Sequence, residues 1–117
     1  YISLETALSF YGIIPEFTYS IISVTIRKSN KVIVSGKEFN YVHISNKYFH
    51  GYVRSDGFWI ATPEKALIDS FYMMAKGIHK LDLDRLDTSR IKRRVFYKIA
   101  SSISYIPFTN LIKKVKI

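Results

Sequence analysis

The chain of 117 residues has no cysteine and no apolar run near the roughly 20 residues that a membrane helix needs. The absence of cysteine excludes a disulfide framework, a thiolate redox site and a zinc finger. No leader with a basic stretch followed by an apolar one opens the sequence. We therefore expect a soluble, cytoplasmic protein that has no membrane partner.

Acidic residues are scarce. Nine Asp and Glu stand against 18 Lys and Arg, which gives a formal net charge of +9. The excess is uneven, because no base precedes Arg27 and no acid follows Asp87. A small domain with this imbalance attracts polyanions, and nucleic acid is the commonest polyanion in a cell. A solvated basic surface that only keeps the protein in solution is the alternative interpretation.

Packing material, by contrast, is abundant. Hydrophobic residues make up 48% of the chain and aromatic residues 15%, enough to build one core and one domain over residues 1–117. The stretch "SLETALSFYG" predicts an opening helix. Ser3 can cap it, Glu5 lies in its first turn, and Gly12 offers a left-handed exit.

The middle of the chain predicts strands. "TYSIISVTI" is rich in β-branched residues, as strands are. "KVIVSGKEFNYVHI" has two apolar runs around Ser35-Gly36, and "GYVRSDGFWIA" has two around Asp56-Gly57, both typical of tight hairpins. We expect a central antiparallel sheet from Thr18 to Ala61.

The stretch "ATPEKALIDSFYMM" predicts a helix from Pro63 to Lys76. Thr62 is a good cap, Pro63 suits the first helical position, and Glu64 complements the helix dipole. Helical spacing puts three apolar residues on the buried side of this helix: Leu67, Phe71 and Met74. The same spacing forms one polar stripe from Lys65, Asp69, Tyr72 and Lys76. We interpret Glu64 and Lys65 as structural residues of the helix start and not as a catalytic acid-base pair.

A basic helix is predicted after Asp87 or Thr88, with an apolar face of Ile91, Val95, Ile99 and Ile103. A short terminal helix follows Pro107, with Leu111, Ile112 and Val115 pointing inward. The predicted fold class is α+β: a central antiparallel sheet of hairpins, with an N-terminal helix and C-terminal helices packed on it. Two groups of bases are candidates for contact with DNA phosphates: Lys92, Arg93, Arg94 and Lys98 on the basic helix, and Arg27, Lys28 and Lys31.

No pattern of catalysis stands out. None of the nine acids has the lysine two residues later that a common nuclease signature requires. Asp82 and Asp84 form a DxD pair without a preceding phosphate-binding turn, and nothing in the spacing of His43, His50 and Asp56 fixes them on one metal ion. Gly-rich phosphate loops, GxSxG and HExxH are missing. We predict a binding domain with no catalytic residue, metal or cofactor.

Several motifs carry a family resemblance. "YISLETALSFYGIIPE", "YSIISVTIRKS", "FNYVHI", "YFHGY" and "IATPEKALIDSFY" occur in the same order in the AbiEi family of abortive-infection antitoxins, which the chain resembles from Tyr1 to about Tyr72. The motif around Ala61 to Asp69 is the hallmark of that family's C-terminal domain. Beyond Gly77 the similarity is loose.

The resemblance implies a bacterial antitoxin and transcriptional regulator that represses its own operon. In that family a winged helix usually precedes this domain, and a neighbouring gene encodes a nucleotidyltransferase toxin. The toxin is countered as in type IV systems, without a stable toxin-antitoxin complex. This chain begins inside the family pattern, so no winged helix is expected in it, and we expect phosphate contacts to DNA of low sequence specificity.

Two other classes of function stay open at this stage. One is a cryptic or degraded nuclease-like enzyme, against which the missing acid-x-lysine pattern speaks. The other is a protein-interaction module whose aromatic surface binds a partner through Tyr48, Phe49 and Trp59.

Overall fold

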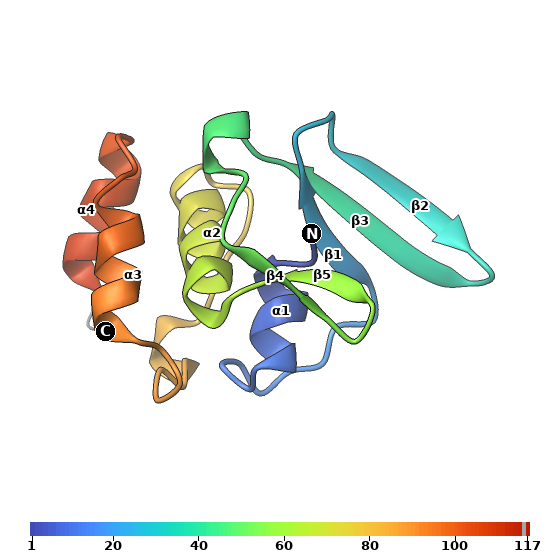
Figure 1. The fold of residues 1–117 in the computed structure, drawn as a ribbon, viewed down its shortest axis with the longest axis horizontal. Helices are drawn as coiled ribbons and strands as arrows, with labels where there is room; N and C mark the ends of the chain where they lie inside the picture. Colours follow the sequence, from blue (N-terminus) through green and yellow to red (C-terminus); the bar gives the residue numbers. More distant parts are fainter. Residues whose placement is uncertain (116) are drawn as a thin grey trace.

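The computed structural model describes residues 1–115 and residue 117, and it confirms the α+β class (Figure 1). These residues form four α-helices, five strands and two single turns of 3₁₀-helix. The helices are α1 (Leu4–Phe10), α2 (Pro63–Ala75), α3 (Arg93–Ala100) and α4 (Ile106–Lys114). The strands are β1 (Ile21–Thr25), β2 (Asn30–Val34), β3 (Lys37–His43), β4 (Tyr52–Ser55) and β5 (Phe58–Ala61). The 3₁₀ turns are η1 (Asn46–Tyr48) and η2 (Leu83–Arg85).

Both predicted hairpins form. β2 pairs with β3 across Ser35-Gly36, and β4 pairs with β5 across Asp56-Gly57, each in antiparallel register. The φ angles of the turn residues are all positive, from 48° at Asp56 to 85° at Gly57. Two successive positive φ angles define the type I′ turn that matches the twist of the flanking strands.

The expectation that the whole sheet is antiparallel is wrong for β1. β1 runs parallel to β3, and the strand order of this three-stranded sheet is β1-β3-β2. The physical reason is that β1 pairs with the second strand of the hairpin, β3, and not with the first, β2. β3 is partly buried and takes the central place, whereas β2 is exposed along its whole length and remains at the edge. Figure 1 shows this hairpin projecting from the body of the molecule.

The first three residues connect the two sheets, which the sequence did not predict. Ile2 makes an antiparallel bridge to Ser23 and a parallel bridge to Ile60. Its N–H donates to the carbonyl of Trp59 at 2.9 Å, and the N–H of Ser3 donates to the carbonyl of Ile22 at 3.0 Å. Residues 1–3 therefore lie as a short strand between β1 and β5.

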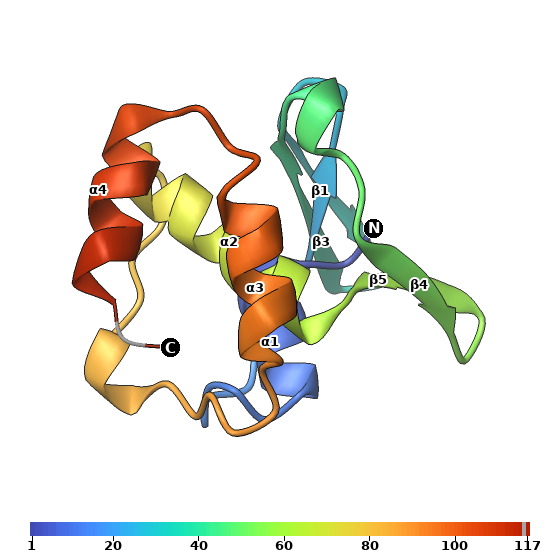
Figure 2. The same cartoon turned by 60° about the vertical axis from the view of Figure 1, so that its left-hand side comes forward.

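Helix α2 begins as predicted and forms the centre of the core. The side chain of Thr62 accepts a hydrogen bond from the N–H of Lys65 at 3.2 Å, and Pro63 occupies the first turn. Leu67 and Phe71 are completely buried, as expected. α2 contacts α1, β5, α3 and α4. Figure 2 shows α2, α3 and α4 on one side of the molecule and the strands on the other.

The predicted exposed stripe on α2 is wrong. Lys65 and Asp69 are each 1% exposed, Tyr72 is buried as well, and Met74 is only partly buried. Elements surround the helix on nearly every side, so its polar residues face other parts of the chain instead of water.

Helix α3 begins at Arg93, later than the predicted start at Asp87 or Thr88. Its buried residues are Phe96 and Ala100, while Val95 is 39% exposed, so the predicted apolar face is displaced by about one residue. Pro107 lies inside the first turn of α4, where a missing N–H costs nothing, and does not interrupt it. In the part of the chain that the structure describes, no helix combines the length and apolar character needed to cross a membrane.

Candidate nucleic-acid interface

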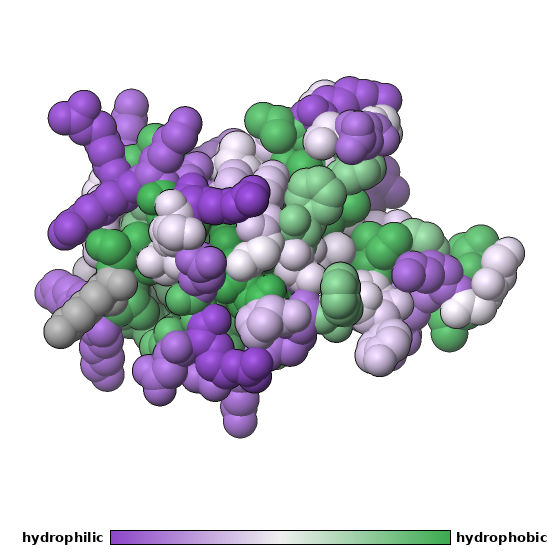
Figure 3. Space-filling model, turned by 90° about the horizontal axis from the view of Figure 1, so that it is seen from below, coloured by the Kyte–Doolittle hydropathy of each residue, from purple (hydrophilic) through white to green (hydrophobic). Residues whose placement is uncertain are grey.

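The four bases predicted on the C-terminal helix are all exposed, and we call them the α3 basic face: Lys92 just before the helix, and Arg93, Arg94 and Lys98 on it. Burial of Phe96 and Ala100 orients this face. Phe96 packs edge-on against Phe71 of α2, with ring centres 6.1 Å apart. At 100° per residue, Arg94 and Lys98 lie one turn apart and far from Phe96 around the helix. Figure 3 shows strongly hydrophilic side chains projecting at the end of the molecule that carries α3 and α4.

No member of the α3 basic face forms an ion pair with any acid among residues 1–115 and 117. Arg93 lies over the ring of Tyr97, 5.6 Å from its centre. Like charges one turn apart repel one another, and an anion placed between them relieves that repulsion. The positive end of the helix dipole lies at the same end of α3 as Arg93 and Arg94, where the carboxylate of Glu64 accepts the N–H of Lys92.

The second predicted group is also exposed but lies elsewhere. Arg27 and Lys28 lie in the turn between β1 and β2, and Lys31 lies on β2. Lys31 is within 3.6 Å of the carboxylate of Glu38, which partly neutralises it. In Figure 1 the turn lies at the top near the middle of the molecule, whereas α3 lies at the left end, beyond α2. The structure therefore does not bring the two groups together on one face.

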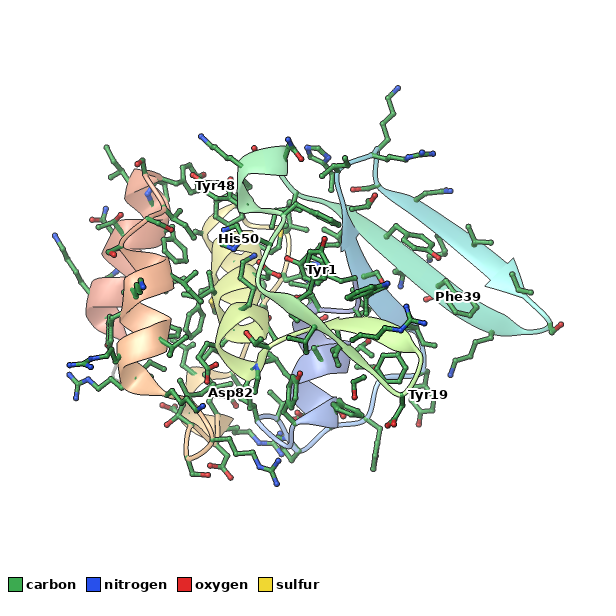
Figure 4. All side chains as sticks on the ribbon, in the orientation of Figure 1. Tyr1, Tyr19, Phe39, Tyr48, His50 and Asp82 are labelled. Carbon is green, nitrogen blue, oxygen red and sulfur yellow. The ribbon has the colours of Figure 1, made fainter. Side chains whose placement is uncertain are left out.

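The charged residues of α2 form a buried polar network instead. Lys65 Nζ contacts Asp69 Oδ1 at 2.5 Å and donates to the Tyr48 carbonyl at 2.7 Å and to the Tyr1 hydroxyl at 3.0 Å. The other carboxylate oxygen of Asp69 accepts hydrogen bonds at 2.8 Å from the hydroxyls of Tyr1 and Ser3. In Figure 4, Tyr1 lies beside the sheet, and Tyr48 and His50 lie nearer to α2. This network ties the first residues and η1 to α2.

The chemistry of this network is structural. All three donors of the Lys65 ammonium are used, as expected for a charge that is buried at low cost. Burial raises the pKa of Asp69, and the ammonium of Lys65 beside it acts in the opposite direction. None of five surface grooves formed by the described residues is lined by Lys65, Asp69, Tyr1 or Ser3.

Glu64 has a role that the sequence analysis missed. Its side chain is 6% exposed, and its Oε2 accepts the N–H of Lys92 at 2.9 Å. Lys92 is the residue that precedes α3, so Glu64 satisfies a backbone donor at the start of that helix. Glu64 therefore makes a structural contact with α3 and also lies in the first turn of its own helix.

The other candidate residues for chemistry are separate. Asp82 accepts the N–H of Asp84 at 3.1 Å and so caps η2. His43 Nδ1 lies 3.0 Å from the carbonyl of Arg27. Among the residues that the structure describes, no three His, Cys, Asp or Glu gather in a group that could hold a metal ion.

The predicted aromatic surface is only partly present. Tyr48 is buried and packs edge-on against Tyr72, whereas Trp59 is 48% exposed. Phe49 packs against Tyr1 and Tyr52, and Trp59 packs against Tyr52. Tyr52, which the sequence analysis did not select, is therefore the residue that connects Phe49 with Trp59.

A comparison with protein-family models, curated proteins and solved structures found no match to this chain.

Proposed function

We propose that this chain is a DNA-associated domain of an antitoxin and transcriptional autoregulator, of the kind found in the AbiEi family. The observation that carries the proposal is the α3 basic face, whose four exposed bases lack acidic partners among the described residues. The order of the motifs between Tyr1 and Tyr72 supports the family assignment. Such a regulator acts in the cytoplasm and opposes a nucleotidyltransferase toxin without a stable complex.

The part of this chain in DNA binding is contact with phosphates. Lysine and arginine side chains on one helix neutralise phosphate charges and release counterions, which gives affinity and orientation but no base recognition. In a longer regulator, sequence specificity comes from a separate element such as a winged helix. The buried network of Lys65 and Asp69 fits this role, because it fixes α2, and α3 packs against α2.

A salt titration of DNA binding tests the proposal. The test variant carries Lys92→Gln, Arg93→Gln and Lys98→Gln, and the matched control loses the same charge through Arg27→Gln, Lys28→Gln and Lys31→Gln. For the test variant, the slope of log K against log salt should shrink by about 0.9 for each phosphate that is no longer neutralised, on any duplex. Circular dichroism first checks that each variant is folded.

The outcomes are distinct. A smaller slope in the α3 variant than in the control supports the proposal. Equal slopes in the wild type and the α3 variant would show that this face is only a solvated surface. A reduced slope in the control alone would move the interface to the turn between β1 and β2.

A further inference from the structure

The β4–β5 hairpin presents a surface of different chemistry, which we call the aromatic platform: Tyr52, Arg54 and Trp59. Arg54 and Trp59 are directly opposed across the two strands, and Tyr52 lies two residues from Arg54 along β4. Alternate residues of a strand point to the same side, so all three share one face of the hairpin. Trp59 is 48% exposed and Tyr52 is 37% exposed.

Aromatic contacts hold Tyr52, one of the three residues of the platform, in place. The ring of Tyr52 stacks on Tyr1 at 4.7 Å with 19° between the planes, and its other contacts are Phe49 at 5.4 Å and the edge-on ring of Trp59 at 5.7 Å. Tyr1 is in turn fixed by its hydroxyl, which donates to Asp69 of the buried network. These contacts on several sides reduce the ordering that the ring of Tyr52 needs when a ligand arrives, which lowers part of the entropic cost of binding.

The charge on the platform is positive. The guanidinium of Arg54 lies over the ring of Trp59, 5.3 Å from its centre, and Arg54 has no ion pair with an acid in the described part of the chain. The net charge of +9 adds a long-range attraction for polyanions. Aromatic rings beside an unpaired arginine are the features by which proteins hold single-stranded nucleic acid: bases stack on the rings, and the guanidinium pairs with phosphate.

We propose that the aromatic platform binds single-stranded nucleic acid through stacking of a base on Trp59. The bases of a duplex are already stacked on one another, so the platform selects unpaired nucleotides, unlike the α3 basic face. A protein partner would also use Trp, Tyr and Arg. The uncompensated positive charge favours the polyanion. This inference does not depend on the proposed antitoxin function.

The experiment uses the fact that Trp59 is the only tryptophan of the chain. Its fluorescence is measured while the full chain is titrated with a thymidine oligonucleotide of about 8 nucleotides, within the usual footprint of such sites. An abasic oligonucleotide of the same length is the second probe, since it keeps the phosphates and lacks the bases. The expected result is saturable quenching by the first probe and at least tenfold weaker binding of the second, roughly the effect of removing one stacked base.

Variants localise the effect through the anisotropy of a labelled thymidine oligonucleotide. Trp59→Ala should weaken binding roughly tenfold or more, and Trp59→Phe should weaken it less because a ring remains. Val53→Ala is the matched control, because Val53 is 46% exposed on the opposite side of the same hairpin. The α3 triple variant should keep the difference between the thymidine and abasic probes.

The proposal is overturned if the abasic oligonucleotide binds as tightly as the thymidine one, or if Trp59→Ala binds like Val53→Ala. It is also overturned if the folded wild type binds no single strand, in which case a protein partner becomes the occupant to test. Weaker duplex binding by the α3 variant, with quenching of Trp59 retained, would support two separate surfaces.

Discussion

Helices α2 and α3 both carry lysine beside apolar residues, yet the charged side chains are buried on α2 and exposed on α3. On α2 the charged side chains of Glu64, Lys65 and Asp69 are all buried. On α3 every base remains exposed. The amphipathic pattern of each helix in isolation does not explain this difference.

Partners from distant parts of the chain explain it. Lys65 has Asp69 one turn away, and Tyr1, Ser3 and Tyr48 complete the hydrogen bonds of the pair. The bases of α3 form no ion pair with an acid in the described part of the chain, and the carboxylate at the start of this helix, that of Glu64, accepts the backbone N–H of Lys92 instead. A charge can be buried when its partners are fixed by the fold, and it stays at the surface when they are missing.

Removing one member of the buried pair should have the largest effect. Lys65→Met leaves the carboxylate of Asp69 buried without its cation, so we expect a decrease of about 3–5 kcal/mol in the free energy of unfolding. Lys98→Met, the same change on α3, should alter stability by no more than about 0.5 kcal/mol because Lys98 is exposed. Urea unfolding measures both variants. Similar values for the two would contradict the comparison.

Gly51, which lies against the side chain of Lys65, should be the position where substitution has the next largest effect on stability. A Cβ on Gly51 would lie 2.7 Å from Cγ of Lys65, whose ammonium is held by three partners and cannot retreat easily. Gly57 is the matched control, because its φ of 85° is close to the 78° of Gly51 and a Cβ there meets nothing within 4 Å.

Gly57→Ala should cost about 1 kcal/mol for the left-handed backbone alone. Gly51→Ala should cost about 1–3 kcal/mol more than that, because of the steric conflict with Lys65. Thermal unfolding of the two variants checks the difference. Equal destabilisation would mean that the Lys65 side chain moves freely, contrary to the network described above.

Glu64 joins the two helices and should have an intermediate effect. Glu64→Ala removes the acceptor for the N–H of Lys92, and we expect a decrease in stability of about 1–2 kcal/mol, as for other helix caps. Glu64→Gln keeps an acceptor oxygen and should cost less than about 1 kcal/mol. Chemical denaturation measures both variants. A Glu64→Gln variant as unstable as Glu64→Ala would show that the negative charge itself is required.

Local signals in the sequence were sufficient for the two hairpins and for the start of α2, but not for the start of α3. Positive-φ turn residues at Ser35-Gly36 and Asp56-Gly57 fix the two hairpins, and Thr62-Pro63 fixes the start of α2. The parallel pairing of β1 with β3 was not predictable in the same way, because it depends on which strand of a hairpin is better buried.

The candidate site also has a part that the local sequence predicts and a part that depends on residues far away in the chain. The α3 bases are exposed, as candidates for phosphate contact must be. The burial of Lys65 required Tyr1 and Ser3, which are more than 60 residues away in the chain. The spacing of Lys65 and Asp69 by four residues was a signal for an ion pair, but spacing alone does not say whether a pair faces water or the core.

An ion pair whose two side chains are each 21% exposed gives the smallest expected effect and completes the comparison. His79, just beyond α2, has its Nδ1 3.2 Å from Oε1 of Glu5 on α1. The carboxylate of Glu5 beside the ring raises the pKa of His79 above its ordinary value, and partial burial opposes this only in part. Since the folded-state pKa is raised, protonation of His79 stabilises the fold. That contribution is complete below about pH 6.5, the ordinary pKa of histidine, and is lost as the pH rises through the higher folded-state pKa.

We expect the wild type to lose up to about 1 kcal/mol between about pH 6 and about pH 8, relative to His79→Gln, because solvent screens the pair. Urea unfolding across this range measures the difference. His43→Gln is the control, since the ring of His43 contacts a backbone carbonyl and no carboxylate. If the wild type and His79→Gln show the same dependence on pH, the contact with Glu5 contributes nothing to stability.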